Sequence, residues 1–110
     1  MDDRERRLAE NERLFREVNE GIEKAALRQG QDGHVYDFLC ECSNLDCGFV
    51  LELDLETYEH ARADPAVFVI ASGHELPEIE DVILRGPDYE FVRKRGEAGR
   101  VARKDDPRGG

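Results

Sequence analysis

With 110 residues, 38% of them charged and no tryptophan, the chain can supply apolar side chains for only one small core, which we expect between about Val35 and Lys94. No apolar run approaches the ~20 residues that span a bilayer, and the first residues lack the apolar segment of a secretion signal, so we expect a cytoplasmic protein without a membrane anchor. The net charge of −10 is concentrated in residues 30–92, which carry 15 acidic and 2 basic side chains, and this body should repel the phosphates of a nucleic acid.

Residues 1–30 are predicted to form a long amphipathic helix, from Asp3 to about Gln29, with Gly30 as its stop. Its apolar residues recur at helical spacing and form a stripe, namely Leu8, Leu14, Phe15, Val18, Ile22, Ala25 and Ala26. At 1.5 Å per residue such a helix is about 40 Å long, which exceeds the width of a small globule. The stripe therefore packs on the body of the chain, or it pairs with a second copy or a partner helix.

Residues 31–95 are predicted to form a small acidic α+β domain with antiparallel strands and one short helix. The strands are expected at 35–40, 49–53 and 66–70, and the helix from Leu55 to about Ala63 with Asp54 as its cap. Residues 78–84 fit a helical turn or a strand, and we predict a hairpin with 89–92 around Gly86-Pro87-Asp88. Residues 96–110 show no periodicity and are predicted to be a disordered basic tail.

Three cysteines within eight residues, Cys40, Cys42 and Cys47, give the clearest functional signal. On a strand, Cys40 and Cys42 lie on one face and Glu41 lies on the other. The turn-forming residues 43–46 can then bring Cys47 back beside them. An odd number of closely spaced cysteines does not form an ordinary disulfide framework, so the pattern favours a metal ion in a reducing compartment.

Zinc prefers four tetrahedral ligands, so three thiolates call for one more. We expect His74 to be that ligand, because it follows a predicted buried strand in a Gly73-His74 turn. His34, in the loop before the cysteines, and a shell without histidine are the alternatives, whereas His60 is expected to face water. An iron–sulfur cluster would need four cysteines, and three buried cysteines without a metal are the simplest competing interpretation.

Four segments resemble a small family of uncharacterised, mainly actinobacterial proteins that have a C-x-C-x4-C cluster and a downstream G-H-E motif. The resemblance covers most of residues 8–95. It is carried by Leu14-Phe15-Arg16-Glu17-Val18-Asn19-Glu20, by Cys40-Glu41-Cys42 with Cys47, by Tyr58 through Arg62-Ala63-Asp64-Pro65, and by Gly73-His74-Glu75 with Pro77-Glu78. It implies that His74 belongs to a motif, which strengthens its candidacy as a ligand, and it implies no activity.

Three thiolates and one imidazole would fill the zinc shell and leave no position for a catalytic water. The sequence also lacks H-E-x-x-H, G-x-S-x-G and P-loop motifs. We therefore expect a structural Zn²⁺ site in a protein-interaction or regulatory module that is not an enzyme, with a protein partner or a second copy bound through the N-terminal helix.

Three other functions compete with this one. The first is a thiol redox sensor that releases zinc on oxidation, and the second is a small metalloenzyme in which water replaces His74. The third is nucleic-acid binding through the basic residues between Arg93 and Arg108. We consider this last function weaker, because these side chains can contact the protein's own acidic body.

Overall fold

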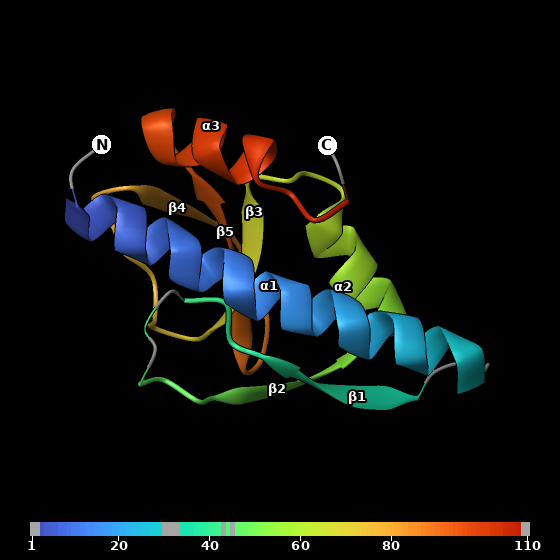
Figure 1. The fold of residues 1–110 in the computed structure, drawn as a ribbon. Coiled ribbons are helices and arrows are strands. Elements are labelled where there is room, and N and C mark those ends of the chain that lie inside the picture. The colour runs from blue at the N-terminus through green and yellow to red at the C-terminus, as the bar shows by residue number, and fades with distance from the viewer. Residues whose placement is uncertain (1–2, 30–33, 43, 45, 109–110) are drawn as a thin grey trace.

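The chain folds into a long helix laid across two small antiparallel sheets, with two short helices beside them (Figure 1). The computed structural model describes residues 3–29, 34–42, 44 and 46–108. The α+β class predicted from the sequence is confirmed. In chain order the elements are α1 (Asp3–Gln29), β1 (Val35–Leu39), β2 (Val50–Asp54), α2 (Leu55–Arg62), β3 (Val67–Ala71), β4 (Glu80–Arg85), β5 (Tyr89–Lys94) and α3 (Gly96–Lys104).

The predicted strands and the short helix α2 form where the sequence places them. β1 pairs with β2, and β3 pairs with β5, which in turn pairs with β4, so the predicted hairpin between β4 and β5 is confirmed. The side chain of Asp54 caps α2 by accepting a hydrogen bond from the Thr57 amide at 2.7 Å. Gly30, the predicted stop of the first helix, lies outside the described residues.

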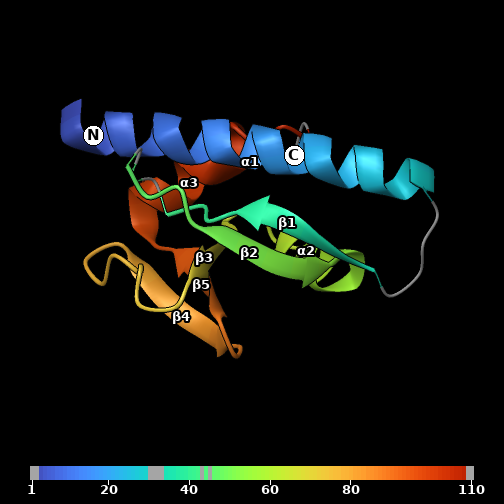
Figure 2. The same cartoon turned by 90° about the horizontal axis from the view of Figure 1, so that it is seen from below.

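The core lies where the two sheets approach each other under α1 (Figure 2). All five residues of β3 are buried, as a continuous apolar strand should be. The rings of Phe38 on β1 and Tyr58 on α2 stack at 4.4 Å between centroids. The chain leaving β1 joins the two sheets, because the Glu41 amide donates to the Val69 carbonyl of β3 at 2.9 Å. The cysteine segment therefore sits at the junction of the two sheets.

The face of α1 that packs on the body is mainly polar, which the sequence analysis did not anticipate. Its buried residues are Glu12, Arg16, Asn19, Glu20, Glu23 and Ala26. The predicted apolar stripe lies along the flank of the helix: Leu8, Phe15 and Ile22 are half-buried, whereas Leu14 and Val18 are 50% and 42% exposed. The helix is thus held by polar contacts, and much of its apolar stripe faces outward.

The expected disordered tail after residue 95 is wrong for most of its length. Residues 96–104 form α3, which packs against α1 and β5. Beyond it, Asp106 pairs with Arg62, and Arg108 pairs with Glu20, Glu23 and Glu59. Arg93, Arg95 and Arg103 also pair with carboxylates of other elements or loops, so this segment belongs to the folded body.

Candidate metal centre

Four side chains that can bind a metal come together at the junction of the sheets. The ligand atoms of Cys40, Cys42, Cys47 and His74 all lie within 4.8 Å of one another. Cys40 and Cys42 are buried, and Cys47 and His74 are partly buried. The structure therefore brings together the four residues selected from the sequence. It places the other two histidines elsewhere, on exposed positions where His34 packs against Tyr36 and His60 against Phe91.

The distances within the cluster suit a tetrahedral ion. His74 Nδ1 lies 3.5 Å from Cys40 Sγ and 3.5 Å from Cys47 Sγ. Zinc bonds of ~2.3 Å to sulfur and ~2.0 Å to nitrogen, set at tetrahedral angles, separate a sulfur from a nitrogen by about 3.5 Å. His74 Nδ1 thus already lies from two of the thiols at the spacing that a bound zinc ion would impose, which favours Nδ1 as the coordinating nitrogen.

Two turns with hydrogen bonds inside them bring the ligands into place. In the first, the His74 amide donates to the Ala71 carbonyl at 3.1 Å, and Gly73 has a φ of 84°, the value that the third residue of a type II turn requires. In the second, the Cys47 amide donates to the Asn44 carbonyl at 3.0 Å. Residues 43 and 45 of the predicted cysteine turn lie outside the described residues. Each turn therefore delivers one ligand to the pair that lies just after β1.

The electrostatic surroundings of the thiols favour a metal over free thiolates. Burial raises the pKa of Cys40, and the neighbouring thiols of Cys42 and Cys47 raise it further. Burial also raises the pKa of Cys42. The Ala71 amide donates to Cys40 Sγ at 3.1 Å, and this bond stabilises a thiolate. The three cysteines form no disulfide in the described part of the chain. A divalent cation would supply the positive charge that three adjacent thiolates need.

Glu41 anchors the cysteine segment from its opposite face, a role that the sequence analysis did not assign. It is 1% exposed. Its carboxylate accepts hydrogen bonds from the Val69 amide at 3.1 Å and from Asn19 Nδ2 at 2.9 Å, and it pairs with Arg16 at 3.5 Å. The predicted alternation is correct, since Glu41 points away from the two thiols. It points into the polar layer beneath α1, so the ligand segment is fixed on both faces.

Two residues of α1 extend this support to the strands. Asn19 pairs with the backbone of Leu39 like a neighbouring strand, since it accepts from the Leu39 amide at 2.7 Å and donates to the Leu39 carbonyl at 2.9 Å. Arg16 donates to the carbonyls of Pro65 and Val67, and its guanidinium lies 3.6 Å from the centre of the Phe68 ring. Arg16 and Asn19 both lie in one of the segments that carry the family resemblance. Their spacing in the sequence does not indicate that they are buried and bind the backbone.

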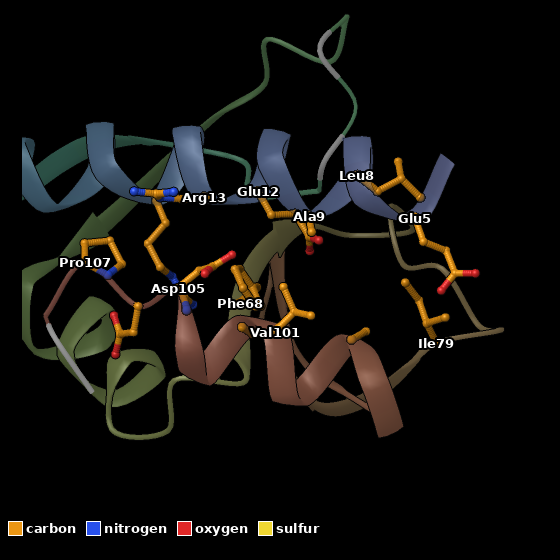
Figure 3. A pocket seen from close by; sticks show the side chains of 14 residues that line it. Glu5, Leu8, Ala9, Glu12, Arg13, Phe68, Ile79, Val101, Asp105 and Pro107 are labelled. Atoms are coloured by element: carbon orange, nitrogen blue, oxygen red, sulfur yellow. The ribbon is translucent and has the colours of Figure 1, made fainter. Parts of the chain in front are cut away.

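A second group of charged side chains lies where α1 meets β4 and β5, away from the cysteines. Lys94 pairs there with both Glu12 and Glu80. Burial raises the pKa of Glu12 to about 7, although Lys94 opposes the rise. Beside Glu12 is a small cavity of about 40 Å³ with a largely apolar lining, and Figure 3 shows Glu12 and Ala9 of α1 facing Val101 of α3 across it. With a lysine already bound between its carboxylates, this cluster is an internal ion-pair group.

Comparison of the chain with protein-family models, curated proteins and solved structures finds no match. The resemblance to the actinobacterial family therefore stays a prediction. Function has to be inferred from the four clustered donors, the surfaces around them and their chemistry.

Proposed function

We propose that the protein is a protein-interaction or regulatory module whose fold is held by one structural Zn²⁺ ion bound to Cys40, Cys42, Cys47 and His74. The clustering of these four donors within 4.8 Å carries the proposal. Thiolate and imidazole are the donors that zinc prefers, and four of them complete its tetrahedral shell. A complete shell holds no reactive water, so we propose no catalysis at this centre.

The surface of the protein supports a role in binding another protein. Leu14 and Val18 of α1 are exposed beside the half-buried Phe15 and Ile22. An apolar strip of this kind on a charged helix suits a partner helix or the same helix of a second copy. We keep this flank of α1 as the proposed contact for a protein partner or a homodimer.

We assign the protein to the cytoplasm, where thiols stay reduced and available for zinc. No helix in the described ranges is long and apolar enough to cross a bilayer. Nucleic acid is not proposed as a partner, because most of the basic side chains near the C-terminus pair with the protein's own carboxylates. Ion pairs with the protein's own carboxylates are formed by Arg93, Lys94, Arg95, Arg100, Arg103 and Arg108.

Metal analysis of the purified chain, with its three histidines varied one at a time, tests the zinc centre. The full chain should bind one zinc per molecule, and its cobalt form should show the absorption of a tetrahedral site with thiolate ligands. His74→Asn should weaken metal binding by at least about tenfold, because one of four ligands is lost. His34→Asn and His60→Asn are matched controls and should retain full affinity. Equal metal binding by all three variants would exclude His74 as a ligand. A zinc shell with water in the fourth position would then have to be considered.

Redox sensing is a second candidate, supported by the partial exposure of Cys47. An oxidant that reaches this sulfur could form a disulfide with a neighbouring thiol and release the ion. Peroxide titration with a zinc-binding dye measures that release. Zinc held at a large excess of peroxide would rule sensing out and leave the structural role.

A further inference from the structure

An open groove of about 580 Å³ lies beside the metal centre. Residues 49–52, on and just before β2, line it together with residues 71 and 72 at and just after the end of β3 and residues 87–89, which lead into β5. The ligand His74 also lines it, and its ring meets Phe49 edge to face at 5.1 Å between centroids. The groove and the metal centre thus share a wall.

β2 exposes unpaired backbone groups at this place. The Cys40 amide donates to the Phe49 carbonyl at 2.9 Å, so these two residues face each other as a hydrogen-bonded pair of the β1–β2 ladder. Because such pairs alternate along an antiparallel ladder, the N–H and C=O groups of Val50 and Glu52 point away from β1. Both residues line the groove. Within residues 34–42, 44 and 46–108, no strand pairs with this edge of β2. An open edge of this kind is a template for another strand.

The side chains around this edge are apolar and acidic. Phe49 and Val50 are 56% and 50% exposed, which is high for large apolar residues. Glu52 is exposed on the strand, and Asp88 lines the opposite side. No lysine or arginine is among the described lining residues, and residues 30–92 as a whole carry a charge of −13 (2 basic minus 15 acidic). An occupant needs apolar side chains and positive charge.

We propose that this groove binds an extended segment of another protein as an added strand on β2, and that the segment alternates apolar and basic side chains. Such β-augmentation uses the backbone for affinity and the alternating side chains for specificity. A second copy of the chain fits less well, since two β2 edges paired antiparallel would bring the acidic Glu52 and Asp54 of each copy together. The inference rests on the proposed interaction function and names the class of partner for it.

The direct test uses a capped peptide of about seven residues, the length of an ordinary strand, that alternates valine with lysine. It is titrated into the zinc-loaded full chain while amide hydrogen exchange is followed. At saturation the amides of Val50 and Glu52 should exchange at least about tenfold more slowly, because each gains a hydrogen-bond acceptor. A peptide methylated on alternate backbone nitrogens should lose this effect.

Charge reversal provides the matched control. Glu52→Lys should weaken binding of the peptide by about tenfold, whereas Glu56→Lys changes net charge equally at an exposed position on α2, outside the groove, and should leave binding unchanged. The inference is overturned if the peptide fails to bind, if it binds without protecting Val50 and Glu52, or if a valine–glutamate peptide binds equally well. Zinc content is measured in each sample. If the peptide fails to bind a zinc-loaded chain, the proposed binding role of the groove is refuted, whereas the proposed zinc centre is not.

Discussion

Two polar clusters meet at residues 40–42, and they balance their charges in different ways. On one face, Cys40 and Cys42 join Cys47 and His74 in a group of three thiols and one imidazole that can bind a metal. On the other face, Glu41 enters the layer beneath α1, where Arg16, Lys94, Arg62 and Arg108 are matched with carboxylates. The first cluster needs an ion from outside, whereas the second supplies its own counter-charges. Residues 40–42 therefore belong both to the metal-binding cluster and to the ion-paired layer, which needs no metal.

This difference predicts that mutations in the two clusters have different effects on zinc content and stability. Loss of a ligand should remove the ion and the packing that depends on it. Loss of a charge from the polar layer should weaken the fold while leaving the ligand set complete. Measurements of zinc content and unfolding free energy on the same variants separate the two outcomes.

The largest effect is expected for Cys40→Ser, Cys42→Ser and Cys47→Ser. Binding of zinc by a thiolate-rich structural site contributes on the order of 10 kcal/mol, which is similar to the total stability of a small domain. Each variant should therefore lose zinc and the packed core around β3. Near-ultraviolet circular dichroism and metal analysis measure both. A variant that lacks metal and keeps its native spectrum would show that the cysteines are ordinary core residues.

The next largest effect is expected for Glu41→Gln. The single amide oxygen can still accept from the Val69 amide, but an NH2 group then faces Asn19 Nδ2, and the buried guanidinium of Arg16 loses its counter-charge. Breaking such a pair costs about 3 kcal/mol. Denaturant unfolding should show this loss while zinc stoichiometry stays at one. Glu56→Gln, at an exposed position of α2, should stay within about 0.5 kcal/mol of the parent chain. Equal stability of the two variants would contradict the proposed role of Glu41.

A pH-dependent effect is expected from Glu12, which faces Lys94, Glu80 and Arg16. Its pKa rises from 4.5 to about 7 on folding. The folded protein therefore holds more of this proton than the unfolded chain between these pH values, and its unfolding free energy falls as pH rises through this window. The fall is at most about 3 kcal/mol.

Glu12→Gln cannot titrate, so it isolates this contribution. Relative to the parent chain, the variant should gain stability as pH rises from about 5 to 7 and show no further gain above that. A stability difference that does not change with pH would show that Glu12 is ionised throughout.

A smaller effect is expected for Asn19→Ala, which leaves both the amide and the carbonyl of Leu39 without their side-chain partner. The cost should be about 2 kcal/mol. Gln29→Ala, at an exposed position of the same helix, is the matched control. Hydrogen exchange should accelerate at the Leu39 amide in the Asn19 variant alone. An unchanged Leu39 amide would mean that Asn19 does not hold the edge of β1.

The difference between the two clusters also explains which features could be predicted from the sequence. The C-x-C spacing, the turn residues after it and the Gly73-His74 turn act locally, so they could be recognised without knowledge of the fold. The strands and α2 follow from local patterns of the same kind. The roles of Arg16, Asn19 and Glu41 depend on contacts across 20 to 51 positions of the chain, and no local periodicity records such contacts. The same holds for residues 96–108, whose charges appear solvated until Asp106 and Arg108 are placed beside their partners.

The ion pairs of Arg108 have a consequence for the order of folding. This residue binds Glu20 and Glu23, which are 88 and 85 positions earlier in the chain, and also Glu59. During synthesis the N-terminal helix leaves the ribosome first, and at ~5–20 residues per second the arginine follows several seconds later. Until then Arg62 is available to Glu20, but Glu23 lacks its ion pair with Arg108. The helix thus completes these contacts only after residue 108 has been synthesised, so its final docking follows the folding of the segments between them.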